Sequence, residues 1–268
     1  MDWLDWMLPE AWNVEHNNLH HYKLGEQGDP DLVERNFEPL RSKPRTPMGM
    51  VSKYAQALGV ALIWKWFYYA PNTLKELEKS KLKKTGEEGA WTHLGDKPAT
   101  IKEVAAGMAK GNMGMANDLM KCLAPYAAMM FLVIPGASWL LFGAQAAKTA
   151  LISTFFAEIL TNIHSFVVIA TNHVGDDIYK FDTPVRPRSD EFYLRAVIGS
   201  TNFHTGCDFG KPGSLKADSV DFSQGWLNYQ IEHHMFPDLS MLSYQRGAPQ
   251  VRAICEKYGV PYVQQPVW

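Results

Sequence analysis

Cysteine is scarce in this sequence, and the way it is spaced excludes two common uses of the residue. Cys122, Cys207 and Cys255 are an odd number without CxxC spacing, so neither a disulfide framework nor a thiolate metal site is indicated. Surplus charge is also lacking: the formal net charge is −2, so no basic surplus suggests a nucleic-acid partner. No glycine-rich phosphate loop or GxSxG nucleophile elbow occurs, and nucleophilic hydrolysis therefore has no support. A metal site here must use nitrogen or oxygen ligands.

Charged residues are absent from one long stretch in the middle of the chain. No Asp, Glu, Lys or Arg occurs between Lys121 and Lys148, although the mean hydropathy of the whole chain is −0.22. A helix needs roughly 20 mainly apolar residues to cross the hydrocarbon core of a bilayer. We therefore predict one membrane span in this stretch and a second from Ala146 to Thr171. Glu158 lies inside the second span and is either a partnered structural residue or part of a substrate path.

A third apolar stretch, from Tyr54 to Ala70, can either cross the membrane or lie flat on it. Lys53 and Lys65 bracket most of it, and tryptophans and tyrosines crowd its end, as is typical of the membrane interface. Two spans return the chain to its starting side, whereas three do not. If the histidine clusters described below form one site, this stretch is predicted to be an interfacial helix.

The remaining segments are polar. The mixed-charge run KELEKSKLKKTGEEG, residues 75–89, is typical of a solvated segment. The N-terminal MDWLDWMLPEAW has two aspartates in its first five residues and no apolar core of signal length, so it does not resemble a secretory signal. Turn-rich stretches such as GEQGDPD and DTPVRPRSD predict the loops of a cap outside the membrane.

Histidine is concentrated near the two ends of the chain. The segments HNNLHH and QIEHH together contain His16, His20, His21, His233 and His234. In an α-helix, His16 and His20 share a face and His21 is turned by roughly 100° from His20. Gln230 and His233, three residues apart, also share a face. Each segment thus presents neighbouring nitrogens, and together they can enclose a site for two metals.

Two further histidines are candidate ligands. His173 lies where the second predicted span leaves the membrane, on the side that both clusters would share. His204, in STNFHTGCDFG, is either a metal ligand or a polar residue of the cap, and His93 is predicted to be a loop histidine. Six or more imidazoles exceed what one zinc ion uses, which indicates two metals. Beside an apolar compartment, paired redox metals suit the activation of O2 against an unactivated C–H bond. The non-catalytic alternative is a membrane protein that stores or senses zinc.

The segment NYQIEHHMFPDLS closely resembles the third and last histidine box of the integral-membrane fatty acid desaturases, particularly the acyl-lipid or front-end branch. In that branch glutamine often replaces the first histidine of the box, as Gln230 does here. EHNNLHH resembles the second box, and the predicted hairpin between the boxes also fits, so the resemblance extends from about Glu15 to Pro237. It implies an all-α fold of polytopic membrane helices, with one transmembrane hairpin present and a cytosolic helical cap that holds a histidine-rich dimetal site.

The resemblance also implies a function. Two iron ions would be ligated by His16, His20, His21, His173, His233 and His234. Gln230 and His204 would be possible ligands or would orient the ligands. The implied enzyme is an oxidoreductase of lipid metabolism that uses O2 to place a cis double bond in an acyl-lipid or acyl-thioester. Electrons would come from a separate ferredoxin or cytochrome, and the boxes would lie on the cytosolic or stromal side of a bilayer.

One departure from the family pattern concerns the first box, an HxxxH or similar pair that normally precedes the second. No histidine precedes His16, so residues 1–268 are predicted to be a desaturase domain that is incomplete at its N-terminus and binds iron poorly by itself. Its expected parts are the second box and loop (1–50), the interfacial helix (51–70), the transmembrane hairpin (118–171) and the cap with the third box (172–268). The same scaffold also serves lipid hydroxylases, acetylenic bond formation and sphingolipid desaturases, and an inactive fragment is a further alternative.

Overall fold

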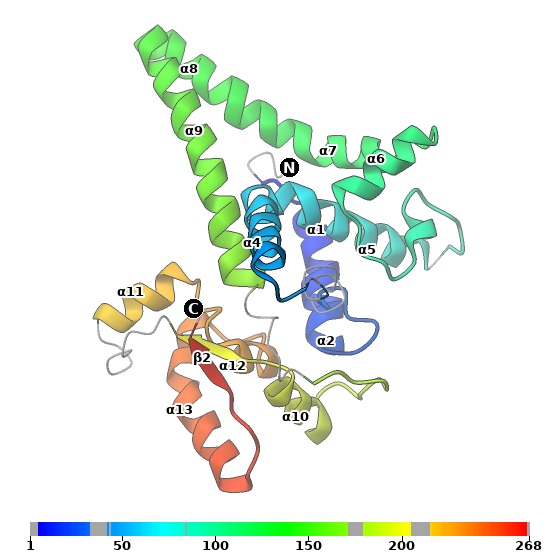
Figure 1. The fold of residues 1–268 in the computed structure, drawn as a ribbon, viewed down its shortest axis with the longest axis vertical. Helices are drawn as coiled ribbons and strands as arrows, with labels where there is room; N and C mark the ends of the chain where they lie inside the picture. The colour runs from blue at the N-terminus through cyan, green and yellow to red at the C-terminus, as the bar shows by residue number, and fades with distance from the viewer. Residues whose placement is uncertain are drawn as a thin grey trace. The chain divides into compact units, whose positions relative to one another are not determined.

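The computed structural model describes residues 5–32, 42, 44–83, 85–170, 179–204 and 215–266. The chain consists of two compact units (Figure 1). Unit 1 comprises Met1–Asn18 and Pro39–Ser165, and unit 2 comprises Leu19–Glu38 and Phe166–Trp268. Almost all regular structure in the described residues is helical, in agreement with the predicted all-α class.

Unit 1 is a set of helices packed around a small apolar core. Its elements are α1 (Pro9–Trp12), α4 (Pro47–Leu62), π-helical η2 (Lys65–Tyr69), α5 (Ala70–Leu82), 3-10 helical η3 (Thr92–Leu94), α6 (Ile101–Ala109), α7 (Gly114–Ala128), π-helical η4 (Met129–Val133), α8 (Ile134–Phe142) and α9 (Ala144–Ser165). Trp91 is buried among residues of α5, α6 and α7, and its Nε1 donates a hydrogen bond to Asp118 at 3.2 Å. The Glu78 carboxylate accepts the backbone N–H of Trp91 at 2.7 Å, which holds the loop that carries the indole against α5.

The prediction of a solvated run at residues 75–89 is wrong for its first residues. Lys75 and Glu76 lie in α5 and are buried. The Lys75 ammonium pairs with the Glu76 carboxylate at 2.7 Å and donates to the carbonyl oxygen of Lys97 at 2.8 Å. Charged groups are buried when each has such partners, which a list of charges along the chain does not reveal. Further along the run, Lys79 and Lys81 are exposed, as predicted.

The start of α6 is set by a capping box. The Thr100 side chain accepts the backbone N–H of Lys102, and the Glu103 carboxylate accepts the backbone N–H of Thr100 at 2.9 Å. Each bond satisfies a donor that the helix itself leaves without a partner. We expect Thr100→Ala to lower the free energy of unfolding by about 1 kcal/mol. Denaturation in detergent measures the change, and Thr100→Ser, which retains the hydroxyl, should be close to wild type. Equal losses in the two variants would contradict this explanation.

Two long apolar helices form a hairpin in the middle of the chain. The first runs without interruption from Gly114 to Phe142 and the second from Ala144 to Ala170, where α9 continues into π-helical η5 (Phe166–Ala170). Gly143 turns the chain between them with a positive φ of 87°, which glycine adopts without strain. Both helices are long and apolar enough to cross a bilayer, and only 11% of the most apolar part of each is buried within the protein. A core helix of a soluble protein would be mostly buried, so the low burial favours the predicted membrane hairpin.

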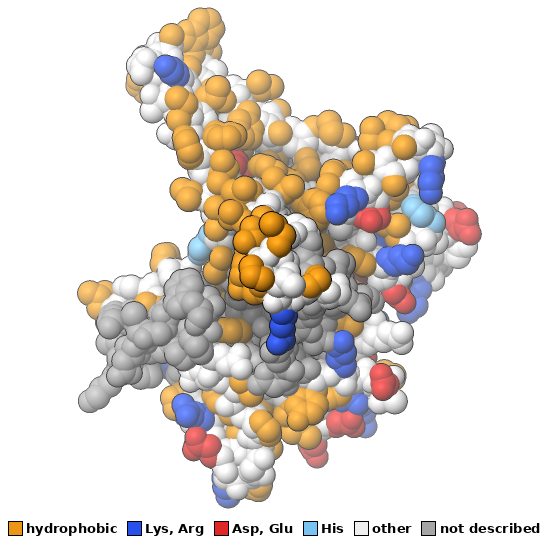
Figure 2. Space-filling view, in the orientation of Figure 1, with side chains coloured by type: hydrophobic (Ala, Val, Ile, Leu, Met, Phe, Trp, Pro, Cys, Tyr) orange, Lys and Arg blue, Asp and Glu red, His pale blue; other side chains and the backbone are white. Residues whose placement is uncertain are grey.

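The surface of the hairpin agrees with this assignment. Figure 2 shows mostly hydrophobic side chains over the part of the molecule that Figure 1 labels α8 and α9. The largest exposed ones include Leu132, Leu140, Leu141, Phe142 and Leu160. In water such a surface would be costly at about 25 cal/mol for each Å² of apolar area, whereas the acyl chains of a bilayer cover it without that cost.

Glu158 proves to be a partnered structural residue, which resolves the two alternatives for it. Its carboxylate lies 2.8 Å from the ammonium of Lys65, and both side chains are about 5% exposed. The hydroxyl of Tyr126 donates to the same carboxylate. Asn162, one turn further along α9, accepts the backbone N–H of Lys65 at 2.8 Å. Lys65 thus ties η2 to the hairpin, where the sequence had indicated a lysine at the membrane interface.

Unit 2 positions the second histidine cluster on a short helix. Its elements are α2 (His21–Lys23), η5, α10 (Asp190–Ile198), β1 (Asn202–His204), α11 (Leu215–Ser223), α12 (Gln230–Met235), α13 (Met241–Tyr258) and β2 (Gln264–Pro266). The two strands are parallel, with Asn202 opposite Gln264. Ile231 of α12 is fully buried against Val197 of α10 and Cys255 of α13. The helix that carries the histidines is therefore held from two sides by apolar packing.

Candidate metal centre

The first histidine cluster lies on a helical segment that begins as η1 (Asn13–His20) and continues as α2. The segment η1 is π-helical, so its backbone hydrogen bonds join residues five apart instead of four. This wider turn brings His21, five residues after His16, towards the side of His16. Short π-helical turns occur frequently at functional sites.

One pair of imidazoles joins the two clusters. Nε2 of His20 lies 3.1 Å from Nε2 of His234, although the residues are 214 positions apart. The other nitrogen of each ring is held by the protein: Nδ1 of His20 is 2.8 Å from Asp29, and Nδ1 of His234 is 2.7 Å from the hydroxyl of Ser200. Both rings are at most 1% exposed. Each imidazole is therefore oriented from behind so that its Nε2 faces that of the other.

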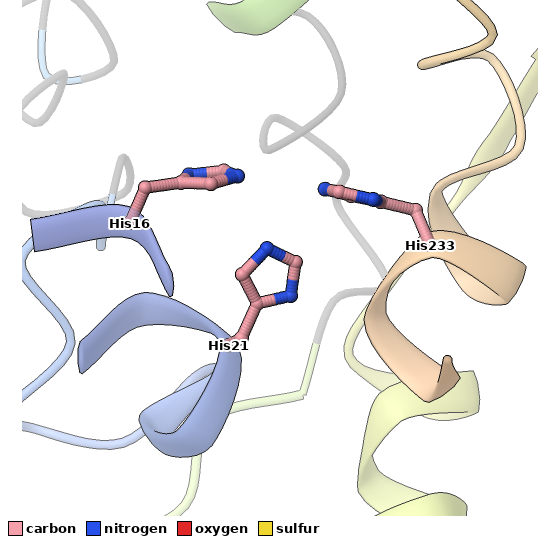
Figure 3. A group of neighbouring side chains, drawn as sticks. All are labelled: His16, His21 and His233. Atoms are coloured by element: carbon pink, nitrogen blue, oxygen red, sulfur yellow. The ribbon is translucent and has the colours of Figure 1, made fainter. Parts of the chain in front are cut away.

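Two further histidines of the clusters, His21 and His233, face each other beside this pair. The rings of His21 and His233 are 4.5 Å apart between centroids and nearly perpendicular. Figure 3 shows the rings of His21 and His233, which both belong to unit 2, turned toward a common space. Ligand atoms of His20 and Asp31, which lie in the same unit, are also within 4.8 Å of each other. The prediction that HNNLHH and QIEHH meet is thus supported by the geometry.

The electrostatic surroundings differ among the histidines. Burial lowers the pKa of His233 to about 4, and the positive charge of protonated His20 acts in the same direction. Burial also acts to lower the pKa of His20, but the charge and hydrogen bond of Asp29, with the charge of Asp31, outweigh it and raise this pKa. Metals bind the unprotonated nitrogen of an imidazole. His233 is therefore already in its ligand form at neutral pH.

A polar network under α12 fixes the direction of its histidines. The Glu232 carboxylate accepts hydrogen bonds from the Asn202 amide at 2.8 Å and from the Tyr262 hydroxyl at 2.9 Å. The Asn202 amide oxygen in turn accepts the backbone N–H of Ile231 at 2.9 Å. Burial raises the pKa of Glu232, although the hydrogen bonds from Asn202 and Tyr262 act in the opposite direction. These contacts anchor the residues immediately before His233 to β1 and the C-terminal segment.

Gln230 lies at the start of α12 and is 2% exposed. Its amide nitrogen donates to the carbonyl oxygen of Leu227 at 2.8 Å. Its amide oxygen is buried and accepts no hydrogen bond from the residues that the structure describes. A buried acceptor of this kind is costly unless a partner is supplied, and a metal-bound water or a metal ion would supply one. This is consistent with the expected role of Gln230 near a metal.

The remaining predicted residues have different outcomes. His173 lies outside the described residues, so its expected role as a ligand stays a prediction. His204 is the last residue of β1, and its side chain is also outside the description. His93 is exposed in η3, as predicted for a loop histidine. Sequence reasoning missed Asp29 and Ser200, although GDPD directly after the first cluster signals a turn whose aspartates bond to nearby groups.

The donor set fits transition-metal ions. Two nitrogens bound to one metal at roughly 2.1 Å, in adjacent positions, are about 3 Å apart. The observed 3.1 Å between the Nε2 atoms of His20 and His234 agrees with this separation. Each Nδ1 bonds to a carboxylate or hydroxyl, which is the usual support of a metal-ligating histidine. Nothing in the geometry selects iron over zinc, copper or nickel, because imidazole suits them all.

Comparison with known proteins identifies the scaffold. The model of the fatty acid desaturase family matches residues 1–266 of the chain. The chain belongs to the fatty acid desaturase family. Its relatives include an NADPH-dependent stearoyl-CoA 9-desaturase of Mycobacterium tuberculosis, 31% identical over 118 residues, which are 43% of this chain and 25% of that protein. Fatty acid desaturase 3 of Bos taurus is 47% identical over 47 residues, 18% of this chain and 11% of the relative. No solved structure matches this chain significantly.

Membership of the family gives the histidine cluster an expected setting in a helical membrane protein. The segments of similarity to these relatives cover no more than about a quarter of the relatives' own length. Desaturases are oxidoreductases of lipid metabolism, and the family is membrane-bound and helical, in agreement with the two apolar helices of this chain. The facing imidazoles of His20 and His234 could bind a metal ion.

Proposed function

We propose that this chain acts in a membrane acyl-lipid desaturase that forms a cis double bond at a histidine-ligated diiron centre. The observation that carries the proposal is the meeting of His20 and His234, from segments 214 positions apart, with their Nε2 atoms 3.1 Å apart in a buried cluster. Bound iron would supply the activation of O2 that an attack on an unactivated C–H bond needs. Overall, the acyl chain loses two hydrogens, and O2 with two electrons and two protons yields two waters.

The proposed iron ligands are the imidazoles of both clusters together with His173: His16, His20, His21, His173, His233 and His234. Gln230 and His204 are proposed as further ligands or as residues that orient the ligands. The protein contributes orientation through Asp29 and Ser200, and it excludes water, since His20, His21 and His234 are at most 1% exposed. A dry site protects reactive oxygen chemistry from side reactions.

The hairpin allows both clusters to lie on one side of the membrane. The first cluster precedes both apolar helices in the chain and the second follows them, so two crossings return the chain to its starting side. We place the cluster on the cytosolic or stromal side. The electrons come from a separate donor, a ferredoxin or a cytochrome, and the substrate is an acyl-lipid or acyl-thioester. Residues 1–268 are proposed to form one desaturase domain with the second and third boxes at its two ends.

The helix α4 is proposed to lie in the membrane interface. Its 16 residues extend about 24 Å, short of the roughly 30 Å of a hydrocarbon core. Met48, Val51, Tyr54 and Leu58 are spaced three or four residues apart, and each is more than half exposed. An apolar stripe of this kind on a short helix suits the boundary between headgroups and acyl chains. The proposed interfacial helix, α4, overlaps only the first part of the predicted 51–70 segment, and Lys65 and Tyr69 in the second part are buried.

Expression of the complete gene in a host that lacks the unsaturated product lipid tests this proposal. We expect purified protein to contain iron, and the host lipids to gain a cis double bond in an acyl chain. Elemental analysis and mass spectrometry of the lipids give both readouts, with His93→Ala as a matched control because His93 is exposed in η3. A hydroxy lipid without a new double bond would show that the enzyme hydroxylates the acyl chain and does not desaturate it. Zinc without iron would favour a storage or sensing protein.

A further inference from the structure

The loop that follows α2 contains a buried carboxylate. Asp29 is 2% exposed, and its Oδ1 lies 2.8 Å from Nδ1 of His20. Two backbone N–H groups of the same loop donate to it: Asp31 to Oδ1 at 2.9 Å, and Gly25 to Oδ2 at 3.0 Å. Gly25 has a positive φ of 72°, which lets its N–H turn back toward the carboxylate. The loop therefore fixes Asp29 before any metal binds.

The chemistry of this contact fixes the tautomer of His20. An ionised carboxylate only accepts hydrogen bonds, so Nδ1 of His20 must donate and carry a proton. The ligand nitrogen of the ring is then Nε2, which faces Nε2 of His234 at 3.1 Å. A carboxylate behind an imidazole also makes that imidazole a stronger donor to a metal. Asp29 thus both aims His20 and strengthens it.

The partner ring is held by a different group. Ser200 is 2% exposed, follows α10, and places its hydroxyl 2.7 Å from Nδ1 of His234. A hydroxyl can donate or accept, so it orients the ring in either tautomer but does not select one. It also carries no charge and therefore strengthens the imidazole less than a carboxylate does. The two facing rings thus have unequal support.

We propose that Asp29 is the positioning residue that presents Nε2 of His20 to a metal ion, and that Ser200 does the same, more weakly, for His234 on that ion. The proposal rests on the proposed function in one respect only, namely that these histidines hold a metal. Asp29 and Ser200 act behind the rings, at Nδ1, and are not themselves ligands. A loop aspartate outside both histidine boxes is thereby assigned to the metal centre.

Metal titration of the full-length protein in detergent tests the proposal. The probe is Co²⁺ alone, whose absorption spectrum reports the ligand field, followed by Fe²⁺ under anaerobic conditions. We expect Asp29→Asn to weaken metal binding by about 10- to 100-fold and to change the Co²⁺ spectrum. Ser200→Ala should weaken binding by roughly tenfold or less. Neither readout depends on turnover.

The matched control is Glu26→Gln in the same loop. Glu26 is also buried, and it accepts the backbone N–H of Val185 at 2.8 Å, but it is paired with Arg195 and not with a histidine. We expect Glu26→Gln to bind Co²⁺ as the wild type does, even where its stability is reduced. If Asp29→Asn does not fold, Ser200→Ala tests the proposal in its place, because loss of one hydroxyl leaves the loop intact. Wild-type metal affinity in Ser200→Ala would then overturn the proposal.

The outcomes separate this inference from the proposed function. A wild type that binds neither metal would remove the proposed function. A wild type that binds metal, together with an Asp29→Asn variant of unchanged affinity and spectrum, would overturn the positioning role alone. A loss of stability in Asp29→Asn with unchanged metal affinity has the same meaning, since it shows that Asp29 serves only the loop.

Discussion

Removing one partner of the buried ion pair between Lys65 and Glu158 is expected to lower the free energy of unfolding by about 3–5 kcal/mol. The two charges are 2.8 Å apart and about 5% exposed, and the pair joins η2 to α9. Lys65→Met leaves the carboxylate of Glu158 buried with only the Tyr126 hydroxyl and no counter-charge. Glu158→Gln leaves the ammonium in the same position, with aromatic rings near it but no carboxylate. An uncompensated charge in such surroundings costs far more than the lost attraction itself.

Combining the two substitutions provides the control for this prediction. The Lys65→Met and Glu158→Gln double variant removes both charges and keeps an amide oxygen for the Tyr126 hydroxyl. Replacement of a whole buried pair is often close to neutral, so we expect the double variant to recover at least half of the loss. Thermal or detergent denaturation of the four proteins gives the coupling between the sites. Single variants that lose less than about 1 kcal/mol would show that water or lipid headgroups reach the pair.

Substitution of His234 by alanine is expected to have the largest effect on function. His234 faces His20 across 3.1 Å, and its ring also lies 5.5 Å from that of His21. Its loss removes one ligand of the ion that we propose the pair holds. We expect the iron content per chain to fall by at least about half and product formation to fall by more than about 100-fold. That exceeds the 10- to 100-fold effect of residues that only orient a ligand.

The thermodynamic readout separates a lost ligand from a damaged fold. A metal that binds only the folded state stabilises it by about 2.7 kcal/mol at a concentration 100 times its Kd. We expect added Fe²⁺ to raise the Tm of the wild type and of His93→Ala but to have much less effect on His234→Ala. His93 is exposed in η3 and is therefore a histidine change outside the cluster. An equal rise of Tm in all three proteins would remove His234 from the ligand set.

Several features could be predicted from the sequence because they depend on neighbours along the chain. The uncharged stretch between Lys121 and Lys148 indicated the hairpin, since a bilayer excludes charge over a fixed thickness. The spacing of HNNLHH and QIEHH indicated a shared site, because each segment presents neighbouring imidazoles and two such segments can enclose metal ions. The family could be assigned from the same motifs, and the model of the fatty acid desaturase family matches residues 1–266.

Other features depend on partners that are distant in the sequence. Lys65 lies 93 residues from Glu158. The residues around Lys65 agree equally with a position at the membrane interface and with a position in the protein core. Lys75 and Glu76 belong to a run that local composition assigns to solvent, yet the first two residues of that run are buried. The π-helical form of η1 likewise follows no local signal that we can name, and it places His21 on the side of His16.

The sequence by itself determined the family of this protein, its two histidine segments and the apolar hairpin between them. Those are properties of residue types and their spacing. Only the tertiary structure decided which side chains support these segments, with Asp29 behind His20, Ser200 behind His234, and Lys65 against Glu158. The reason is physical, because a hydrogen bond or ion pair depends on a separation of about 3 Å in space. Chain position constrains that separation only within a helix turn or a tight loop.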